Sequence, residues 1–446
     1  MSNHTLPRDL GDGLRLRRST AADAEKLCDF NARIHANNPE QPDLRIGQWA
    51  ADLLTLPHPT FGTGDFTIIE EQATGRIVSS LNHISQTWSY EGIPFKVGRP
   101  ELVGTLPEYR HKRLIQLQFD EIHRWSLERG EMVQAITGIP HYYCQFGYEM
   151  GLELSGGRTG FAPLIPSLKE GESEPYQLRP ATLADIPFLD MLYTHAGSRQ
   201  LIRTMRDEAI WRHELTGRSE RNVNRIETRI IQKPDGEPVG YITHPWFNWD
   251  WGLALFEYEL KPGLSWLAVT PSVARYMLAT SKAYALRDNE PLEQKTAIAF
   301  TFGSEHPVYD AWREKLPRIR QPYAWYVRVP DLPGFIRHIA PALENRLAGS
   351  LACGHSGILR LNLYKTGLKL TLENGKLTSV EAYKPQPNDM GDVGLPGLTI
   401  IQLIFGHRNL DELRHMYADC YWESDDFRVI TTALFPKKPS SVVGVV

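Results

Sequence analysis

The segment from Leu102 to Gly130 constrains the fold most strongly, because its pattern changes from strand to helix across one short basic turn. Apolar and β-branched residues begin at Leu102 and end at Pro107. A helical run follows from Gln116 to Gly130, with apolar positions at Leu114, Leu117, Phe119, Ile122, Trp125 and Leu127. A strand, a basic turn and a helix together offer backbone N–H groups and a positive helix end, which suit a pyrophosphate.

The chain also contains an internal repeat. The segment Leu16–Ala24 (LRRSTAADA) recurs as Leu178–Ile186 (LRPATLADI), in each case as a short strand ending in Thr and a helix with Asp in its first turn. The two copies predict two related α/β domains in tandem. Chance similarity over nine residues is the alternative interpretation.

Length and composition describe a soluble protein of several domains. The chain has 446 residues, of which 41% are hydrophobic and 23% charged, and two to four domains are expected. No apolar run is long enough to span a membrane, and the polar N-terminus contains no signal segment, so we expect a cytoplasmic protein without a membrane span. The net charge of −4, with both signs mixed along the chain, argues against nucleic acid as a partner.

Metal binding is not expected, because the four cysteines (Cys28, Cys144, Cys353 and Cys420) form no C-x-x-C pair and the histidines show no metal-binding spacing. The turn-rich stretch from Gly156 to Pro175 predicts a linker. The segment Ser265–Leu278 is expected to be the second copy's counterpart of the strand–turn–helix, without the basic residues.

The pattern changes again after Pro330. The sequence predicts a helix over Leu332–Leu347, an alternating strand over Ile358–Tyr364, and a hairpin over Leu368–Val380 that turns at Asn374-Gly375. Helices are expected over Leu398–Phe405 and Leu410–Tyr417. These elements predict a small sheet with helices on one face.

Together with the aromatic segment Tyr142–Tyr148 (YYCQFGY), the strand–basic turn–helix resembles the coenzyme A site of GNAT N-acetyltransferases. A small sheet with helices resembles a sterol-carrier-protein-like domain. The order of all three parts resembles the enhanced intracellular survival (Eis) family. This resemblance implies an α/β (α+β) protein with a GNAT domain at 1–160, a degenerate GNAT-like domain at 161–329 and a sterol-carrier-like domain at 330–446. It also implies a homo-oligomer.

The resemblance assigns acetyl-CoA as co-substrate and implies the residues that hold it. The backbone of the strand at Leu102, Val103 and Thr105 would pair with the pantetheine arm, and Thr137 and Gly138 would lie where the next strand diverges. The pyrophosphate would bind the turn formed by Arg110, His111, Lys112, Arg113, Leu114 and Ile115. Arg113 stands where the family has glycine. Its Cβ crowds the phosphate and, if φ is positive there, adds strain, whereas its guanidinium attracts phosphate.

The resemblance also implies the catalytic groups. Tyr143, which opens Y-x-x-F-G-Y, would protonate the departing thiolate, and Tyr142 is its neighbouring competitor. The base would be the C-terminal carboxylate of Val446, which requires the apolar tail to dock rather than fray. Glu101 is the alternative base.

Three further residues are candidates for contact with the acceptor. His83 is a weaker candidate base, and Trp88 and Tyr90 are expected to face the substrate as an aromatic wall for an amine, although they could instead cap a hairpin. The expected function is acetyl transfer from acetyl-CoA to a primary amine of a small molecule or peptide. The alternative is a non-catalytic scaffold or apolar-ligand-binding protein in which Arg113 marks a lost cofactor site.

Overall fold

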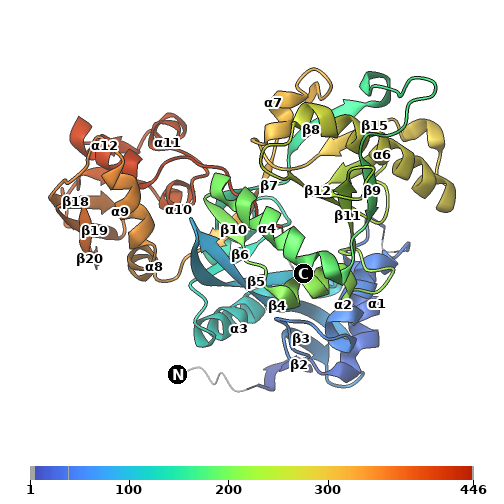
Figure 1. Ribbon diagram of the computed structural model, residues 1–446. Helices are drawn as coiled ribbons and strands as arrows, with labels where there is room; N and C mark the ends of the chain where they lie inside the picture. Colours follow the sequence, from blue (N-terminus) through green and yellow to red (C-terminus); the bar gives the residue numbers. More distant parts are fainter. Residues whose placement is uncertain (1–5, 39, 444–446) are drawn as a thin grey trace.

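The computed structural model describes residues 6–38 and 40–443. It has a mixed α/β fold built of several sheets with flanking helices, which confirms the predicted fold class. Figure 1 shows three lobes: the N-terminal sheet below, a second unit at the upper right and the C-terminal unit at the left.

The N-terminal sheet has the strand order β1-β2-β3-β4-β5-β6-β17-β7, and β10 pairs with the end of β4. Helices α1 and α2 pack over one apolar cluster of this sheet and α3 over another. The bounds are β1 Arg8–Gly11, β2 Leu14–Arg18, α1 Ala24–Ile34, α2 Leu44–Thr55, β3 Phe66–Glu71, β4 Ile77–Tyr90, β5 Ile93–Thr105, α3 Leu114–Glu128, β6 Val133–Ile136, β7 Glu149–Leu154, β10 Ile202–Thr204 and β17 Tyr323–Arg328.

The second unit contains two small sheets, ordered β14-β12-β11-β9 and β13-β15-β8-β16. Its core lies mainly between these strands and the long helix α6. The bounds are β8 Gly157–Phe161, β9 Gln177–Pro180, α4 Ile186–Ala196, α5 Glu208–Thr216, β11 Ile226–Gln232, β12 Pro238–Pro245, β13 Gly252–Leu255, β14 Glu257–Leu260, α6 Trp266–Arg287, β15 Ala297–Phe300, α7 Pro307–Ala311 and β16 Arg318–Arg320.

The sheets do not follow the expected division of the chain at 160 and 329. Strand β8, from the expected first domain, pairs with β15 and β16 of the second unit. Strand β17, from the expected second domain, lies between β6 and β7 of the N-terminal sheet. The two units therefore exchange strands, and the stretch predicted as a linker from Gly156 contains a paired strand.

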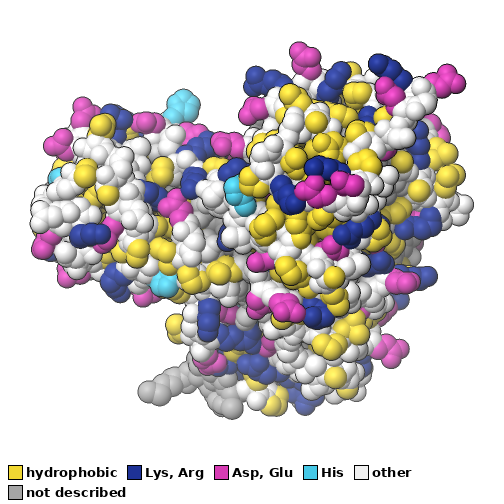
Figure 2. Space-filling view, viewed as in Figure 1, with side chains coloured by type: hydrophobic (Ala, Val, Ile, Leu, Met, Phe, Trp, Pro, Cys, Tyr) yellow, Lys and Arg dark blue, Asp and Glu magenta, His cyan; other side chains and the backbone are white. Residues whose placement is uncertain are grey.

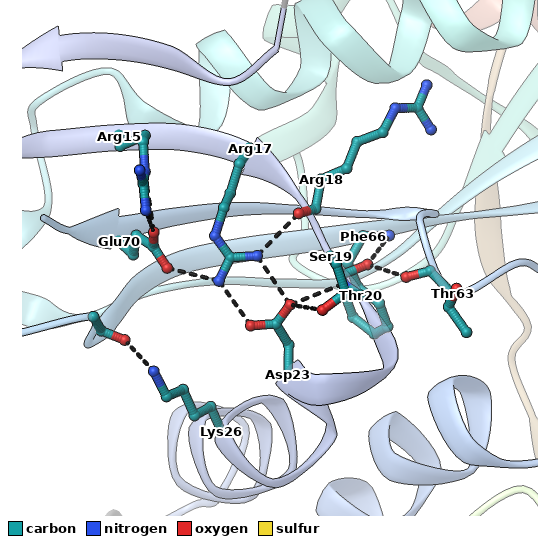
Figure 3. Close-up of polar contacts among 11 residues, drawn as sticks. Arg15, Arg17, Arg18, Ser19, Thr20, Asp23, Lys26, Thr63, Phe66 and Glu70 are labelled. Atoms are coloured by element: carbon teal, nitrogen blue, oxygen red, sulfur yellow. Dashed lines mark hydrogen bonds and ion pairs between the residues drawn. The ribbon is translucent and has the colours of Figure 1, made fainter.

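The repeated motif forms the same local structure in both copies. Thr20 and Asp23 form a capping box, and Arg17 donates to both oxygens of Asp23 at 2.9 and 2.7 Å (Figure 3). Thr182 and Asp185 form the second capping box, and Arg179 donates to Asp185 at 2.8 and 2.7 Å. The two copies therefore share their local contacts as well as their sequence pattern.

The first copy carries one additional acidic partner. Glu70 of β3 accepts from Arg17 and from Arg15, each at 2.6 Å, so that Arg17 bridges two carboxylates (Figure 3). In the second copy, Arg179 reaches the amide oxygen of Gln232 at 3.0 Å instead. The replacement of a carboxylate by an amide leaves the geometry of the turn unchanged.

The C-terminal unit has a sheet ordered β20-β19-β18-β21-β22. Asn374 and Gly375 both have positive φ at the predicted hairpin turn. The single helix expected over Leu332–Leu347 is divided at Ile339, just before Pro341. The bounds are α8 Leu332–His338, α9 Ala340–Ala348, β18 Gly357–Asn362, β19 Gly367–Glu373, β20 Lys376–Tyr383, β21 Val393–Gly394, α10 Thr399–Ile404, α11 Leu410–Met416, β22 Tyr421–Trp422 and α12 Asp425–Leu434.

The surface carries charges of both signs. On the face in Figure 2, Lys and Arg side chains are interspersed with Asp and Glu rather than gathered in one basic patch. Within residues 6–38 and 40–443, no helix is both long and apolar enough to cross a membrane.

Candidate active site

Strands β5 and β6 diverge at the centre of the N-terminal sheet. They pair in parallel only at Val97 with Val133 and at Gly98 with Gln134. Beyond Gly98, β5 continues to Thr105 without a β6 partner, while β6 pairs with β17 on its other side. The divergence leaves one side of β5 open as a slot in which an extended ligand can pair with backbone groups.

A β-bulge lies within the open part of β5. The register with β4 shifts between Ser80, which opposes Gly104, and Asn82, which opposes Glu101. Leu102 has φ +53° at this point, an uncommon value for a residue with a branched side chain. Bulges reorient backbone groups and are common beside active sites. The bulge places Leu102 and Val103, two expected cofactor-binding residues, at the slot.

The expected cofactor turn leads from this slot into helix α3. The helix begins at Leu114 rather than Gln116, and Arg113 is its N-cap residue with φ +59° and ψ +22°. The Arg113 side chain makes no capping hydrogen bond, so the first N–H groups of α3 are not satisfied in that way. His111 also has positive φ, at +65°.

Four basic side chains surround this helix end. Arg110, His111, Lys112 and Arg113 are all exposed, and within the described part of the chain none of them forms an ion pair. The cations therefore add to the positive end of the helix without carboxylates to neutralise them. The turn retains the electrostatic character of an anion site despite the missing glycine.

A buried polar network ties α3 to the strands beneath it. Gln118 donates to Ser79 Oγ at 2.6 Å and accepts from Thr67 Oγ1 at 2.9 Å. Ser79 Oγ lies 2.9 Å from the Gly104 carbonyl oxygen and 2.7 Å from Thr105 Oγ1. The expected cofactor residue Thr105 is thereby held to β4, and the helix end is held beside the slot.

Tyr143 lies beside the divergence on the short helix Tyr142–Phe146. It is 3% exposed, and a Cβ added at Gly138 would lie 3.6 Å from its hydroxyl oxygen. Burial raises the pKa of Tyr143, and the charge of Glu101 adds to this effect. Among the described residues, the hydroxyl of Tyr143 has no hydrogen-bond partner. Because the pKa of this phenol is raised, it is protonated at neutral pH and can act as a donor. Tyr142, its competitor, is only half buried.

Glu101 forms a buried ion pair with Arg99 on β5. Burial raises the pKa of Glu101, and the Arg99 guanidinium opposes this increase. The guanidinium carbon of Arg99 lies 4.6 Å from the ring centroid of Trp325 on β17. A strand exchanged from the second unit thus supports a charged pair of the first.

The tail after α12 returns to the N-terminal sheet. The Leu201 N–H donates to the Pro439 carbonyl at 2.7 Å, and the Ser441 N–H donates to the Ile202 carbonyl at 3.0 Å. The Thr204 hydroxyl donates to the Val443 carbonyl at 3.1 Å. The tail is therefore docked alongside β10 as far as Val443, and Val446, the expected base, lies outside the described residues.

These parts enclose a cavity of about 400 Å³, called here the acceptor cavity. Of the expected site residues, Glu101 and Thr137 line this cavity. The other lining residues come from both units and from the tail: Trp49, Arg99, Glu153, Leu154, Ser155, Glu214, Val223, Asn224, Ile226, Pro245, Phe247, Phe256, Thr301, Phe302, Gly303, Trp325, Ser440, Ser441, Val442 and Val443.

Three expected substrate contacts lie elsewhere. His83 is completely buried, and its Nε2 lies 2.7 Å from Glu131, above Gly98, where any Cβ would collide with this pair. Trp88 and Tyr90 are also completely buried, and neither lines the acceptor cavity. His83, the weaker candidate base, and the expected aromatic wall of Trp88 and Tyr90 are therefore corrected to core residues.

Tyr90 joins the N-terminal sheet to the C-terminal unit. Its hydroxyl donates to the Ile404 carbonyl at 2.8 Å and accepts from Arg346 at 3.0 Å. Trp88 packs edge-on against Phe95 and Trp325. Sequence spacing placed these rings on the correct strand but could not reveal which unit would cover it. The aromatic wall of the cavity is formed instead by rings distant in sequence, such as Trp49, Phe247 and Trp325.

The second unit has a cavity of about 550 Å³ at a comparable place, lined in part by Glu257 and Glu259 of β14. Its helix α6 begins after Ser265, whose side chain accepts from the Ala268 N–H at 3.3 Å. The expected strand within Ser265–Leu278 is absent from the structure, because this whole segment after Ser265 is helical. A capped helix end without basic neighbours offers less to a phosphate than that of α3.

Among the described residues, no group of three or more His, Cys, Asp or Glu side chains is arranged to hold a metal ion.

Comparison with known proteins agrees with this geometry. Residues 15–151 match the model of the acetyltransferase (GNAT) domain. No curated protein matches the sequence. The fold is similar to that of a GCN5-related N-acetyltransferase from Kribbella flavida, with a TM-score of 0.61, 16% identity and coverage of 100% of both chains.

Two further solved structures are similar over almost the whole chain. A probable N-acyltransferase from Enterococcus faecalis has a TM-score of 0.66 and 13% identity, with coverage of 97% of this chain and 99% of that one. Eis1 from Mycobacterium abscessus has a TM-score of 0.56 and 14% identity, with coverage of 96% and 99%. Residues 15–151 thus match the family model of a GNAT acetyltransferase domain, and the overall fold of the chain is similar to the folds of these solved structures.

Proposed function

We propose that this protein is an acetyl-CoA-dependent N-acetyltransferase that acts on a primary amine of a small molecule or peptide. The observation that carries the proposal is the open slot along β5, which runs between the basic end of α3 and the acceptor cavity. The pyrophosphate of CoA would lie at Arg110–Ile115, and the pantetheine arm would pair with Leu102, Val103 and Thr105. The thioester would reach the cavity near Thr137 and Gly138.

In this mechanism the amine attacks the thioester carbonyl directly. Backbone N–H groups of β5 at the bulge would polarise the carbonyl, and Tyr143 would protonate the departing thiolate. The raised pKa of Tyr143 supports this role, because the phenol is protonated at neutral pH. The amine proton would pass to Glu101 or to the carboxylate of Val446.

The side chains that line the acceptor cavity favour an acceptor molecule that has a cationic group and an apolar body. Its lining contains three carboxylates, Glu101, Glu153 and Glu214, and several aromatic rings. Glu153 accepts from the Ser304 N–H at 2.8 Å, and within the described residues it forms no ion pair. An ammonium group entering the cavity would be attracted by this carboxylate and by the faces of the rings.

The Tyr143→Phe variant tests the proposed acid. We expect turnover to fall about 10²-fold or more, because a positioned acid typically contributes that much. Acetyl-CoA affinity, measured by calorimetry, should stay unchanged, since the ring and its packing are retained. The matched control is Tyr142→Phe, which should keep most of the activity. Equal losses in both variants would contradict the assignment.

A second function, a scaffold with a closed cofactor site, is favoured by one observation: Arg113 occupies the left-handed position that glycine would fill. Titration of acetyl-CoA into wild type and Arg113→Gly separates the two. Micromolar binding by wild type supports the transferase. Binding only by the glycine variant supports the scaffold.

A further inference from the structure

Arg99 is a buried cation that its own surroundings satisfy only in part. The residue is 3% exposed, one Nη atom pairs with Glu101, and the guanidinium lies over the ring of Trp325. Its Nε and its other Nη are buried without a hydrogen-bond partner in the described part of the chain. Unpaired donors on a buried guanidinium are costly, and they mark a place where a ligand can supply the missing acceptor.

Arg99 lies at the wall of the acceptor cavity, where a ligand could reach it. Arg99 lines the acceptor cavity and is the one cation among its described lining residues. The ring of Trp325 and the ion pair with Glu101 hold the guanidinium in place, so that a ligand need not order it. A fixed planar guanidinium is the typical partner of a carboxylate.

The neighbouring carboxylates favour a ligand whose anionic group carries a single negative charge. Glu101 already neutralises Arg99, and Glu153 also lines the cavity. Glu214 is balanced by Arg218 at 3.0 Å. A phosphate dianion would meet these carboxylates at close range, whereas a carboxylate adds a single charge that an ammonium on the same molecule can offset.

We propose that Arg99 is a carboxylate-binding residue of the acceptor cavity. This inference rests on the proposed function, since it describes the acceptor site of the same reaction. The carboxylate belongs either to the acceptor, which is then an amino acid or a similar zwitterion, or to the chain's own end. The second source is considered because Ser440–Val443 of the docked tail line the same cavity.

The test compares equilibrium binding of phenylalanine and phenylalaninamide, which share a ring and an amine and differ in the carboxylate. Calorimetry on the full chain should show at least tenfold tighter binding of the acid. The preference should shrink in Arg99→Lys, which keeps the charge but loses the planar donors. It should vanish in the double variant Arg99→Gln/Glu101→Gln, which removes the ion pair without leaving either charge buried alone.

A chain whose C-terminal carboxylate is converted to an amide distinguishes the two sources, because a shortened chain would still end in a carboxylate. If the chain's own carboxylate occupies Arg99, wild type will bind acid and amide alike, and the amidated chain will gain an acid preference that depends on Arg99. An acid preference in wild type that amidation leaves unchanged assigns the carboxylate to the acceptor. The absence of any preference in both chains, or a preference that persists in the double variant, overturns the proposal.

The readout is binding, so it does not depend on catalysis. Acid-selective binding through Arg99 in a protein that fails to bind acetyl-CoA would refute the proposed transferase while leaving this inference intact. Acetyl transfer to amines by a protein in which Arg99 plays no part in binding a carboxylate would refute this inference and leave the proposed transferase intact. Circular dichroism of each variant confirms that it is folded.

Discussion

Arg113 keeps a positive charge at the basic turn before α3, but its side chain disfavours the backbone conformation at this position. Its φ of +59° lies in the left-handed region, where a Cβ is disfavoured and glycine is not. The position is exposed and begins α3, so the side chain is free to turn towards solvent or towards a bound phosphate. Strain at such a point is tolerated where the surrounding structure enforces it.

The Arg113→Gly variant should be more stable than wild type. We expect an increase of about 1 kcal/mol in the free energy of unfolding, because glycine adopts this conformation without the Cβ penalty. Urea denaturation measures the change. Arg113→Ala is the matched control: it removes the same charge but keeps the Cβ, and should show no such gain. A gain of equal size in both variants would assign the effect to charge instead.

At the scale of elements, α2 and α5 meet through a pair of histidines that carry no charge. His58, just after α2, and His213 of α5 have ring centroids 4.4 Å apart. Burial lowers the pKa of His58 to about 3, and the charges of His213 and Arg218 contribute. Burial likewise lowers the pKa of His213 to about 4. The contact therefore joins the two units only while both rings are neutral.

This contact makes stability depend on pH. The unfolded chain takes up protons on both histidines near pH 6.5, while the folded chain does not until about pH 4, so stability falls as pH decreases through this window. The double variant His58→Gln/His213→Gln should reduce the slope by about 1.4 kcal/mol per pH unit for each histidine. Urea denaturation from pH 7 to pH 4 measures how the free energy of unfolding depends on pH in wild type and in the double variant. An unchanged slope would show that the pair titrates normally.

The docked tail is a second element whose role depends on partners far away in sequence. Its hydrogen bonds with Leu201, Ile202 and Thr204 attach it beside β10, which itself extends the N-terminal sheet. The tail residues that line the acceptor cavity are thus among the last in the chain, but they lie beside β10, which pairs with β4 of the N-terminal sheet.

Two truncations separate the structural and catalytic roles of the tail. Deletion of Val445–Val446 should lower acetyl transfer without changing the melting temperature, because the hydrogen bonds between the tail and Leu201, Ile202 and Thr204 are kept. Deletion of residues 440–446 should also cost about 2–3 kcal/mol of stability, because it removes several buried hydrogen bonds. Turnover at the wild-type rate after the shorter deletion would exclude a carboxylate at position 446 as the base.

At the scale of the whole molecule, strand exchange joins the N-terminal sheet to the second unit. Strand β17 completes the N-terminal sheet between β6 and β7, and β8 lies between β15 and β16. Neither unit is complete when the chain is cut at the boundary that the repeat indicates. Unpaired strand edges and the apolar faces of the missing strands would be exposed in such a fragment.

Fragment expression tests this dependence. A fragment of residues 1–160 should aggregate or unfold without cooperativity, because β6 and β7 lose the strand that joins them. A fragment of residues 1–329 contains both exchanged strands and should be folded more cooperatively. Thermal unfolding and size-exclusion chromatography measure the difference. Cooperative unfolding of the 1–160 fragment as a monomer would contradict the proposed dependence.

Local patterns were sufficient to predict several elements of this protein, although the strand expected within Ser265–Leu278 is helical and the stretch from Gly156 contains a strand. The repeat was recognisable because its capping boxes and Arg–Asp contacts lie within a few residues of each other. The hairpin at Asn374-Gly375 was recognisable because both residues favour positive φ. The basic turn and the position of Tyr143 were likewise visible from neighbouring residues alone.

The errors share a different cause. Trp88 and Tyr90 were expected to face a substrate because nothing near them in sequence shows that Trp325, Ile404 and Arg346 would cover them. Arg99 was missed because its importance lies in a cavity formed by distant segments. One weak signal was present: Arg99 and Glu101 are two residues apart on a strand, so their side chains share a face.

The sequence alone therefore predicts the α/β class, the local structure of the repeated motif, and the basic turn with Arg113 that leads into α3. The exchange of β8 and β17, the docking of the tail and the formation of the acceptor cavity depend on contacts between residues more than a hundred positions apart. Capping, turn formation and strand alternation are short-range effects that each segment expresses independently. Burial depends on which surfaces meet, and that is defined only when the whole chain has folded.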